Sequence, residues 1–205
     1  MEALAQLEGH PHIVQAYDFL ADPDSDDTYW LLLEYVEGET LESYLMESKD
    51  IFINKQLEIL GAIADALNHC HRRNILHRNL TPASIFLTVD GSIKVGNFDY
   101  ARVPMLGFTI SQTGEALVQT RYTAPEQLSD PRTADYRADL YSLGAIWYDM
   151  LFRPGSEEPM LVHQVDNAPI STDAKELLES LLSHRAADRP ESAADVVDWF
   201  ELLKG

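Results

Sequence analysis

The sequence contains few cysteines, few basic residues and no long apolar run. Its one cysteine, Cys70, excludes an intramolecular disulfide and fits a reducing compartment. The longest run of aliphatic and indole side chains, Trp30–Leu33, is far too short to span a membrane. The N-terminal MEALAQLEGHPHIV has neither the basic nor the apolar stretch of a signal peptide. These absences predict a cytoplasmic protein without a membrane partner.

Basic residues are outnumbered by acidic ones. The 205 residues include 15 Lys and Arg against 34 Asp and Glu, a net charge of -19 at pH 7. A surface of this sign repels nucleic acid and anionic lipid, so neither is expected as a partner. Two interpretations of the acidity remain open: it keeps the protein soluble, or it meets a basic surface on a partner protein.

The apolar pattern predicts one domain that is mainly helical. Strands are expected over 13–20, 29–35, 85–88 and 92–95, and helices over 40–47, 54–73, 145–152, 171–183 and 192–203. The 29–35 segment is continuously apolar, which is typical of a strand covered on both faces. The Asp90-Gly91 pair predicts a tight turn between the last two strands.

Local signals refine the helices. Asn54 and Asp139 are expected as N-caps, because their side chains accept hydrogen bonds from free backbone amides. Trp199 is expected to face the core. His69 and His71 lie two apart on one helix, so they diverge, make a poor metal pair and are expected at the surface.

The segment that follows the 54–73 helix carries a distinctive polar motif. It reads H-R-N-L-T-P-A-S, from His77 and Arg78 to Ser84. This motif resembles the catalytic loop of protein kinases, H-R-D-x-K-x-x-N. The resemblance implies that Asn79 stands where the base Asp belongs, Thr81 where the Lys belongs, and Ser84 where the metal-binding Asn belongs.

A second kinase-like motif also departs from the family at its metal-binding position. The family's D-F-G, whose Asp holds magnesium, reads Asn97-Phe98-Asp99 here. Phe98 keeps its apolar anchor, while Asn97 is neutral where a carboxylate is wanted. The resemblance therefore implies no metal site and no intact catalytic residue.

The segment after the 29–35 strand resembles the kinase hinge, which offers backbone groups to an adenine ring. It reads E-Y-V-E-G, and the resemblance implies a nucleotide hinge at Leu33, Glu34, Tyr35 and Val36, with Leu33 at the back of the pocket. A plain strand-to-helix connection is the alternative.

Residues that support the fold of a kinase are present. Glu126 ends an A-P-E motif, Asp139 and Gly144 fall in a D-x-x-S-x-G motif, and Arg189 falls in D-R-P. The resemblance implies that Asp139 holds the backbone of the loop at His77, and that Arg189 forms a buried ion pair with Glu126.

Other kinase features are missing from the N-terminal part. The sequence has no G-x-G-x-x-G motif, and its first lysine is Lys49, after the hinge. The resemblance implies a remnant of the N-lobe over 1–38, with two strands and the hinge, followed by a helical C-lobe over 39–205. The overall fold is therefore expected to be α+β and mainly helical. The cut sheet would expose an apolar edge, and a protein partner is expected to cover it.

The sequence leaves three hypotheses for function. The first is a pseudokinase, a kinase-like module that binds or regulates without transferring phosphate. The second is a divergent ATP-dependent serine/threonine kinase, in which ATP and magnesium bind only if an N-lobe is supplied from outside these residues, either by another chain or by a true start further upstream. The third is a non-functional kinase fragment.

Overall fold

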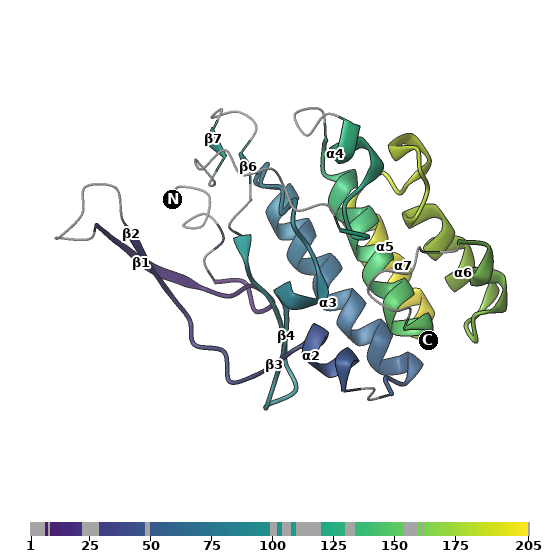
Figure 1. Cartoon of the computed structure of the whole chain (residues 1–205), viewed down its shortest axis with the longest axis horizontal. Helices are drawn as coiled ribbons and strands as arrows, with labels where there is room; N and C mark the ends of the chain where they lie inside the picture. Colours follow the sequence, from purple (N-terminus) through teal and green to yellow (C-terminus); the bar gives the residue numbers. More distant parts are fainter. Residues whose placement is uncertain are drawn as a thin grey trace.

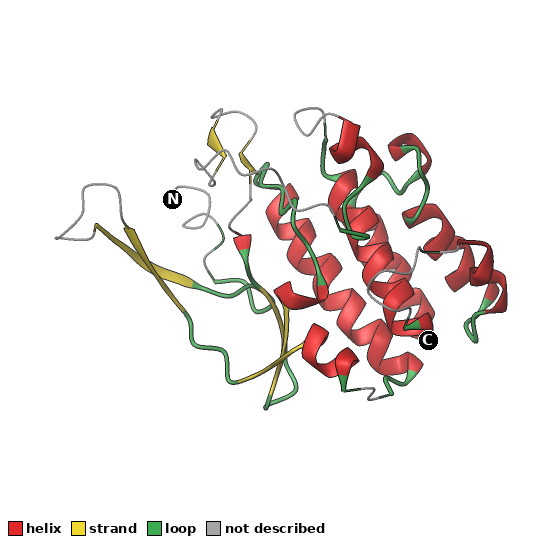
Figure 2. Ribbon diagram, viewed as in Figure 1, coloured by secondary structure: helices red, strands yellow, loops and turns green. Residues whose placement is uncertain are grey.

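The computed structural model describes residues 7, 9–21, 29–47, 50–98, 102–103, 108–109, 120–129, 134–153, 160 and 162–204. Asp99 and most of 100–119 lie outside these ranges. Within them the chain is α+β and mainly helical, as predicted, with helices gathered on one side and strands on the other (Figure 2).

Strands form small antiparallel sheets in the described part of the chain. β1 (Ala16–Ala21) pairs with β2 (Tyr29–Leu33), and this hairpin projects away from the helices (Figure 1). β3 (Gly38–Thr40), β4 (Ile85–Thr88) and β5 (Ile93–Val95) form a second sheet in that order. β6 (Arg102–Val103) pairs with β7 (Phe108–Thr109). The predicted turn between β4 and β5 is present, with Gly91 at a φ of 88°, which favours glycine.

Two long helices, α3 (Ile53–His71) and α5 (Arg137–Phe152), form the centre of the helical body. The remaining helical elements are α2 (Leu41–Met46), η1 (Pro82–Ser84), α4 (Pro125–Ser129), η4 (Val162–Asn167), α6 (Thr172–Leu181), η5 (Ala186–Asp188) and α7 (Ala193–Lys204). Short 3-10 helix η4 occupies part of the region expected to be loop. None of the described helices is both long and apolar enough to cross a membrane.

The core lies where α3, α5 and the C-terminal helices meet. Leu60 and Leu67 on α3 and Leu143 on α5 are fully buried, which follows from their helical spacing. Trp147 packs edge-on against Phe200 of α7, with 5.4 Å between the ring centroids. Cys70 is buried on α3, and burial raises the pKa of its thiol, so it serves as a small core side chain.

Several local predictions need correction. α3 begins after Phe52, which makes no side-chain cap bond, so Asn54 is not the N-cap. α5 begins at Arg137, which places Asp139 in its first turn rather than at its cap. Trp199 is exposed, because Phe200 takes the inward position on α7. His71 is largely buried rather than at the surface, because it bonds a buried carboxylate.

The hairpin also differs from the prediction made for its second strand. Trp30 and Leu32 on one face are 61% and 52% exposed, and Leu31 and Leu33 on the other face are 38% and 43% exposed. Because neighbouring strand residues point to opposite faces, neither face of β2 is covered by the described residues. The expectation of a strand covered on both faces was therefore wrong here.

Candidate functional site

The loop after α3 is held from below by one buried carboxylate. Asp139 Oδ2 accepts hydrogen bonds from the backbone N–H of His77 at 3.0 Å and from His71 Nε2 at 2.8 Å, and its Oδ1 accepts from the N–H of Arg78 at 2.8 Å. Burial opposes ionisation, but the hydrogen bond and charge of His71 outweigh it and lower the pKa of Asp139. Asp139 therefore stays ionised and fixes the loop.

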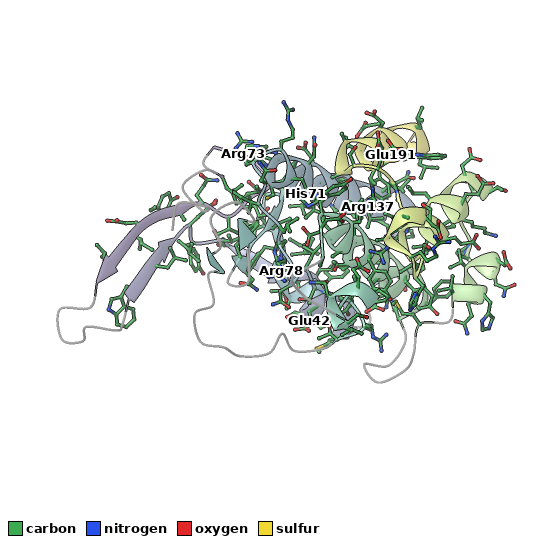
Figure 3. All side chains as sticks on the ribbon, turned by 90° about the horizontal axis from the view of Figure 1, so that it is seen from above. Glu42, His71, Arg73, Arg78, Arg137 and Glu191 are labelled. Carbon is green, nitrogen blue, oxygen red and sulfur yellow. The ribbon has the colours of Figure 1, made fainter. Side chains whose placement is uncertain are left out.

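This fixation matters because the loop is strained at Arg78, whose φ is 65°. A left-handed conformation costs a non-glycine residue roughly 1–2 kcal/mol. The bonds from Asp139, and a bond from Gln127 Nε2 to the Arg78 carbonyl at 3.1 Å, offset that cost. Figure 3 shows Arg78 in the middle of the body, between the hairpin and the C-terminal helices.

His77 joins the loop to the segment after β5. Its Nε2 donates to the carbonyl of Gly96 at 2.9 Å, and its ring packs on Phe98 with 4.6 Å between centroids. His77 and Phe98 are both buried. The loop at 77–84 and the segment at 96–98 are therefore connected as one unit.

Neutral side chains stand at the positions that the kinase resemblance predicts for the reacting groups. Ser84 is buried, and its hydroxyl donates to the carbonyl of Asn79 at 3.2 Å and lies 3.5 Å from Thr81 Oγ1. Asn97 is exposed, and its Nδ2 donates to the carbonyl of Ala83 at 3.1 Å. Its φ of 58° suits an Asn. These groups thus bond neighbouring backbone, and none of them carries a negative charge.

The residues present do not fit a magnesium ion. Divalent magnesium is held in enzymes through carboxylates together with the phosphates of a substrate. The corresponding positions carry two amides and two hydroxyls, and no cluster of acidic or histidine ligands that could hold a metal occurs among the described residues.

Glu34, in the segment predicted as the hinge, connects this segment to Lys94 of β5. Its carboxylate lies 2.8 Å from Lys94 Nζ and accepts from the N–H of Gln15 at 3.1 Å. Burial opposes ionisation of the Glu34 carboxyl, but the contacts with Lys94 and Gln15 together outweigh it and lower the pKa of Glu34. Leu33 and Tyr35 are 43% and 89% exposed, and Val36 is half-buried.

The fold-supporting residues meet between α4, α5 and the segment before α7. Both terminal nitrogens of Arg189 bond Glu126, at 2.7 and 2.9 Å, and its Nε donates to the carbonyl of Ser183. The Arg189 side chain is fully buried. Gly144 lies against α6 so closely that an added Cβ would fall 2.8 Å from Leu181 Cβ.

One polar cluster was not predicted. The Tyr122 hydroxyl donates to Asp149, which also pairs with Arg121 at 3.3 Å. Burial raises the pKa of Asp149. The cluster fixes the segment before α4 to α5. No sequence signal indicated this cluster, because Arg121 and Tyr122 lie beside the A-P-E motif and Asp149 lies on a separate helix, and none of the three belongs to one of the motifs described above.

The sequence matches a known protein family over most of its length. The profile of the family described as "Protein kinase domain" matches residues 1–200. The chain belongs to the protein kinase domain family.

Similar proteins are bacterial serine/threonine-protein kinases. The chain is 36% identical over 144 residues to a probable kinase of Streptomyces coelicolor, an alignment that covers 69% of this chain and 21% of that protein. It is 34% identical over 142 residues to PrkC of Bacillus subtilis, with the same shares. A probable kinase of Clostridium perfringens is 29% identical over 216 residues, covering 98% of this chain and 31% of the relative. The chain thus spans a fifth to a third of the relatives it matches.

Proposed function

We propose that this chain is a pseudokinase, a kinase-family module that binds or regulates protein partners without transferring phosphate. One observation carries the proposal: buried hydrogen bonds from Asp139 hold the backbone of the loop, whereas Asn79, Ser84 and Asn97 offer only neutral groups to a substrate or metal. Phosphoryl transfer depends on magnesium and on a group that orients the attacking hydroxyl. Loss of a general base alone lowers a rate by about 10²–10⁴-fold.

Nucleotide binding is expected to be weak under this proposal. The hinge at Leu33–Val36 has backbone groups for an adenine ring, but the phosphates would lack a bound cation. The acidity of the chain further disfavours anionic ligands. We therefore propose a cytoplasmic module that has no cofactor and binds neither nucleic acid nor membrane.

A protein surface packed on the β1–β2 hairpin is part of the same proposal. Trp30 and Leu32 present apolar surface on one face of a two-stranded sheet, and Leu31 and Leu33 do so on the other. Such surface is seldom left open to water, because it favours pairing with another strand or sheet. A partner that covers it supplies the binding role.

The alternative is an active, divergent serine/threonine kinase, which the names of the relatives favour. Thermal unfolding with ATP, with and without magnesium, separates the two. An active enzyme gains stability by RT ln(1 + [L]/Kd), about 2.7 kcal/mol at 100-fold Kd, and the gain requires the metal. The pseudokinase proposal predicts no magnesium-dependent shift, and a clear one would contradict it.

A further inference from the structure

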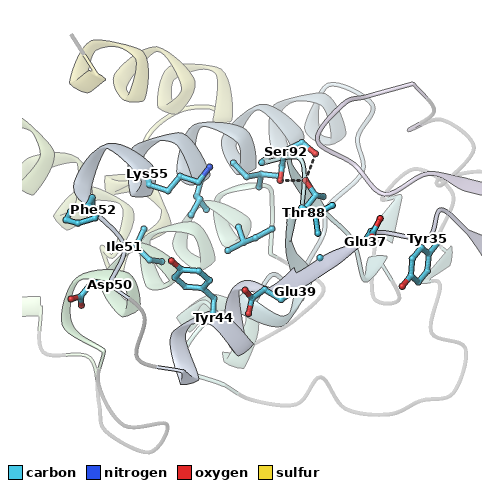
Figure 4. Close-up of a pocket in the computed structure, with 16 residues that line it drawn as sticks. Tyr35, Glu37, Glu39, Tyr44, Asp50, Ile51, Phe52, Lys55, Thr88 and Ser92 are labelled. Atoms are coloured by element: carbon cyan, nitrogen blue, oxygen red, sulfur yellow. Dashed lines mark hydrogen bonds between the residues drawn. The ribbon is translucent and has the colours of Figure 1, made fainter.

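A hollow in the described part of the molecule lies away from the loop at 77–84. It is a cleft of about 660 Å³ between the β4–β5 turn, α2 and the start of α3 (Figure 4). Leu87 lines it, whereas Phe86, the preceding residue on β4, faces Val14 and Gly96. Because successive strand residues point to opposite faces, the cleft is on the face of the sheet opposite to Phe86.

The floor of the cleft is apolar. Ile59 of α3 and Ile93 of β5 are buried beneath it, and Tyr44 of α2 contributes a partly exposed ring. Phe52 and Tyr35 stand at opposite ends, 82% and 89% exposed (Figure 4). Exposed aromatic side chains around an apolar floor are typical anchors of protein interfaces.

The rim of the cleft is acidic. Glu37, Glu39 and Asp50 line it together with one basic lining residue, Lys55. Asp50 lies 3.4 Å from Arg153 Nη2. The Lys55 ammonium lies 3.0 Å from Glu58, so its charge is largely compensated. A phosphate-bearing or acidic ligand would be repelled there, whereas Lys or Arg side chains beside an apolar group would be attracted.

We propose that this cleft binds a protein segment that combines apolar side chains with flanking Lys or Arg residues. The apolar side chains pack on Ile59 and Ile93 between the two exposed rings. The basic side chains pair with Glu37 at the rim. An elongated cleft with an aromatic residue at each end suits an extended segment better than a compact ligand. The inference holds whether or not the chain transfers phosphate.

Selection from random phage-displayed peptides on the intact chain tests the inference. Peptides that also bind the double variant Phe52→Ala/Glu37→Lys are discarded. Because this variant keeps the hairpin, this step removes peptides that bind there instead of in the cleft. Peptides that survive are expected to carry Lys or Arg next to apolar residues. No enrichment, or survivors that are acidic or lack basic residues, would overturn the inference.

Fluorescence anisotropy of one labelled survivor then locates its site. Phe52→Ala and Glu37→Lys are each expected to weaken binding about tenfold, and added salt to weaken it further. Leu202→Ala and Glu179→Lys are matched controls on α7 and α6, where both residues are exposed and outside the cleft. Equal effects of the controls and the cleft variants would contradict the assignment. Cleft variants that melt like the wild type exclude misfolding as the cause.

Discussion

The contacts beneath the kinase-like loop and the side chains above it differ in chemistry. Asp139 beneath the loop, and Arg189 between α4 and α5, are buried charges that form hydrogen bonds to the loop backbone and to Glu126, respectively. Above, Asn79 and Asn97 are neutral and reach water. A buried charge that loses its partner is costly, so positions of the first kind cannot change without destabilising the fold. Exposed positions of the second kind can change at little cost, and the reaction can be lost there while the structure persists.

The largest effect is expected for Glu126→Ala. It would leave the fully buried Arg189 guanidinium without its carboxylate and lower the free energy of unfolding by about 3–5 kcal/mol. Urea denaturation measures this. Asp188→Ala, which removes the exposed partner of Arg185, is the control and should cost no more than about 1 kcal/mol. Similar losses in both variants would show that the Glu126 pair is not special.

Asp139→Asn should have the next largest effect. Hydrogen bonds to a charged group contribute about 1.5–3 kcal/mol each, and we expect a total loss of about 3 kcal/mol at pH 7. Asp173→Asn, at an exposed site in the first turn of α6, should cost less than about 1 kcal/mol.

The same variant gives a pH test. Because the pKa of Asp139 is lowered in the folded state, its stabilising contribution is complete above the unfolded pKa of about 3.9 and is lost as the pH falls through the folded pKa. The difference in unfolding free energy between wild type and Asp139→Asn should shrink below about pH 4. A difference that grows on acidification would show that the folded-state pKa is raised.

Gly144→Ala should have a smaller effect. Overpacking against Leu181 costs about 1–3 kcal/mol and exceeds the gain of about 1 kcal/mol in helix propensity. Gly61→Ala is the control on α3, where the new Cβ would come within 3.2 Å of the flexible end of Lys204 and otherwise make only ordinary contact, with Phe200 Cβ at 3.9 Å. Thermal melts should rank Gly61→Ala at or above wild type and Gly144→Ala below it. The reverse ranking would contradict the close packing of α5 on α6.

The smallest effect is expected for Asn79→Asp. Its side chain is partly exposed, so we expect the unfolding free energy to stay within about 0.5 kcal/mol of wild type in urea. A loss as large as that of Asp139→Asn would mean that Asn79 belongs to the supporting contacts, and the comparison between the two sets would fail.

The sequence predicted what depends on motif spacing and helical period. The positions of α3, α6 and α7 followed from the spacing of apolar residues, and the contacts of Asp139 and Arg189 matched those implied by the kinase resemblance. Such contacts need particular residue types, so they leave a readable pattern.

Features that depend on tertiary surroundings were not predicted. His71 was expected at the surface, but its distant partner Asp139 holds it in the interior. The 29–33 strand is apolar throughout, yet apolarity does not say whether anything packs on it. The cleft beside Phe52 is formed by α2, α3 and the β4–β5 turn. A surface built from separate segments of the chain has no local sequence motif from which it could be predicted.

Transfer of labelled γ-phosphate from ATP, with magnesium or manganese and with protein and peptide acceptors, tests the central claim most directly. We predict that the folded wild-type chain transfers no more label than a heat-denatured sample. Transfer by the wild type that is abolished by Asn79→Ala would contradict the claim, because it would show that a neutral residue at this position still supports the reaction.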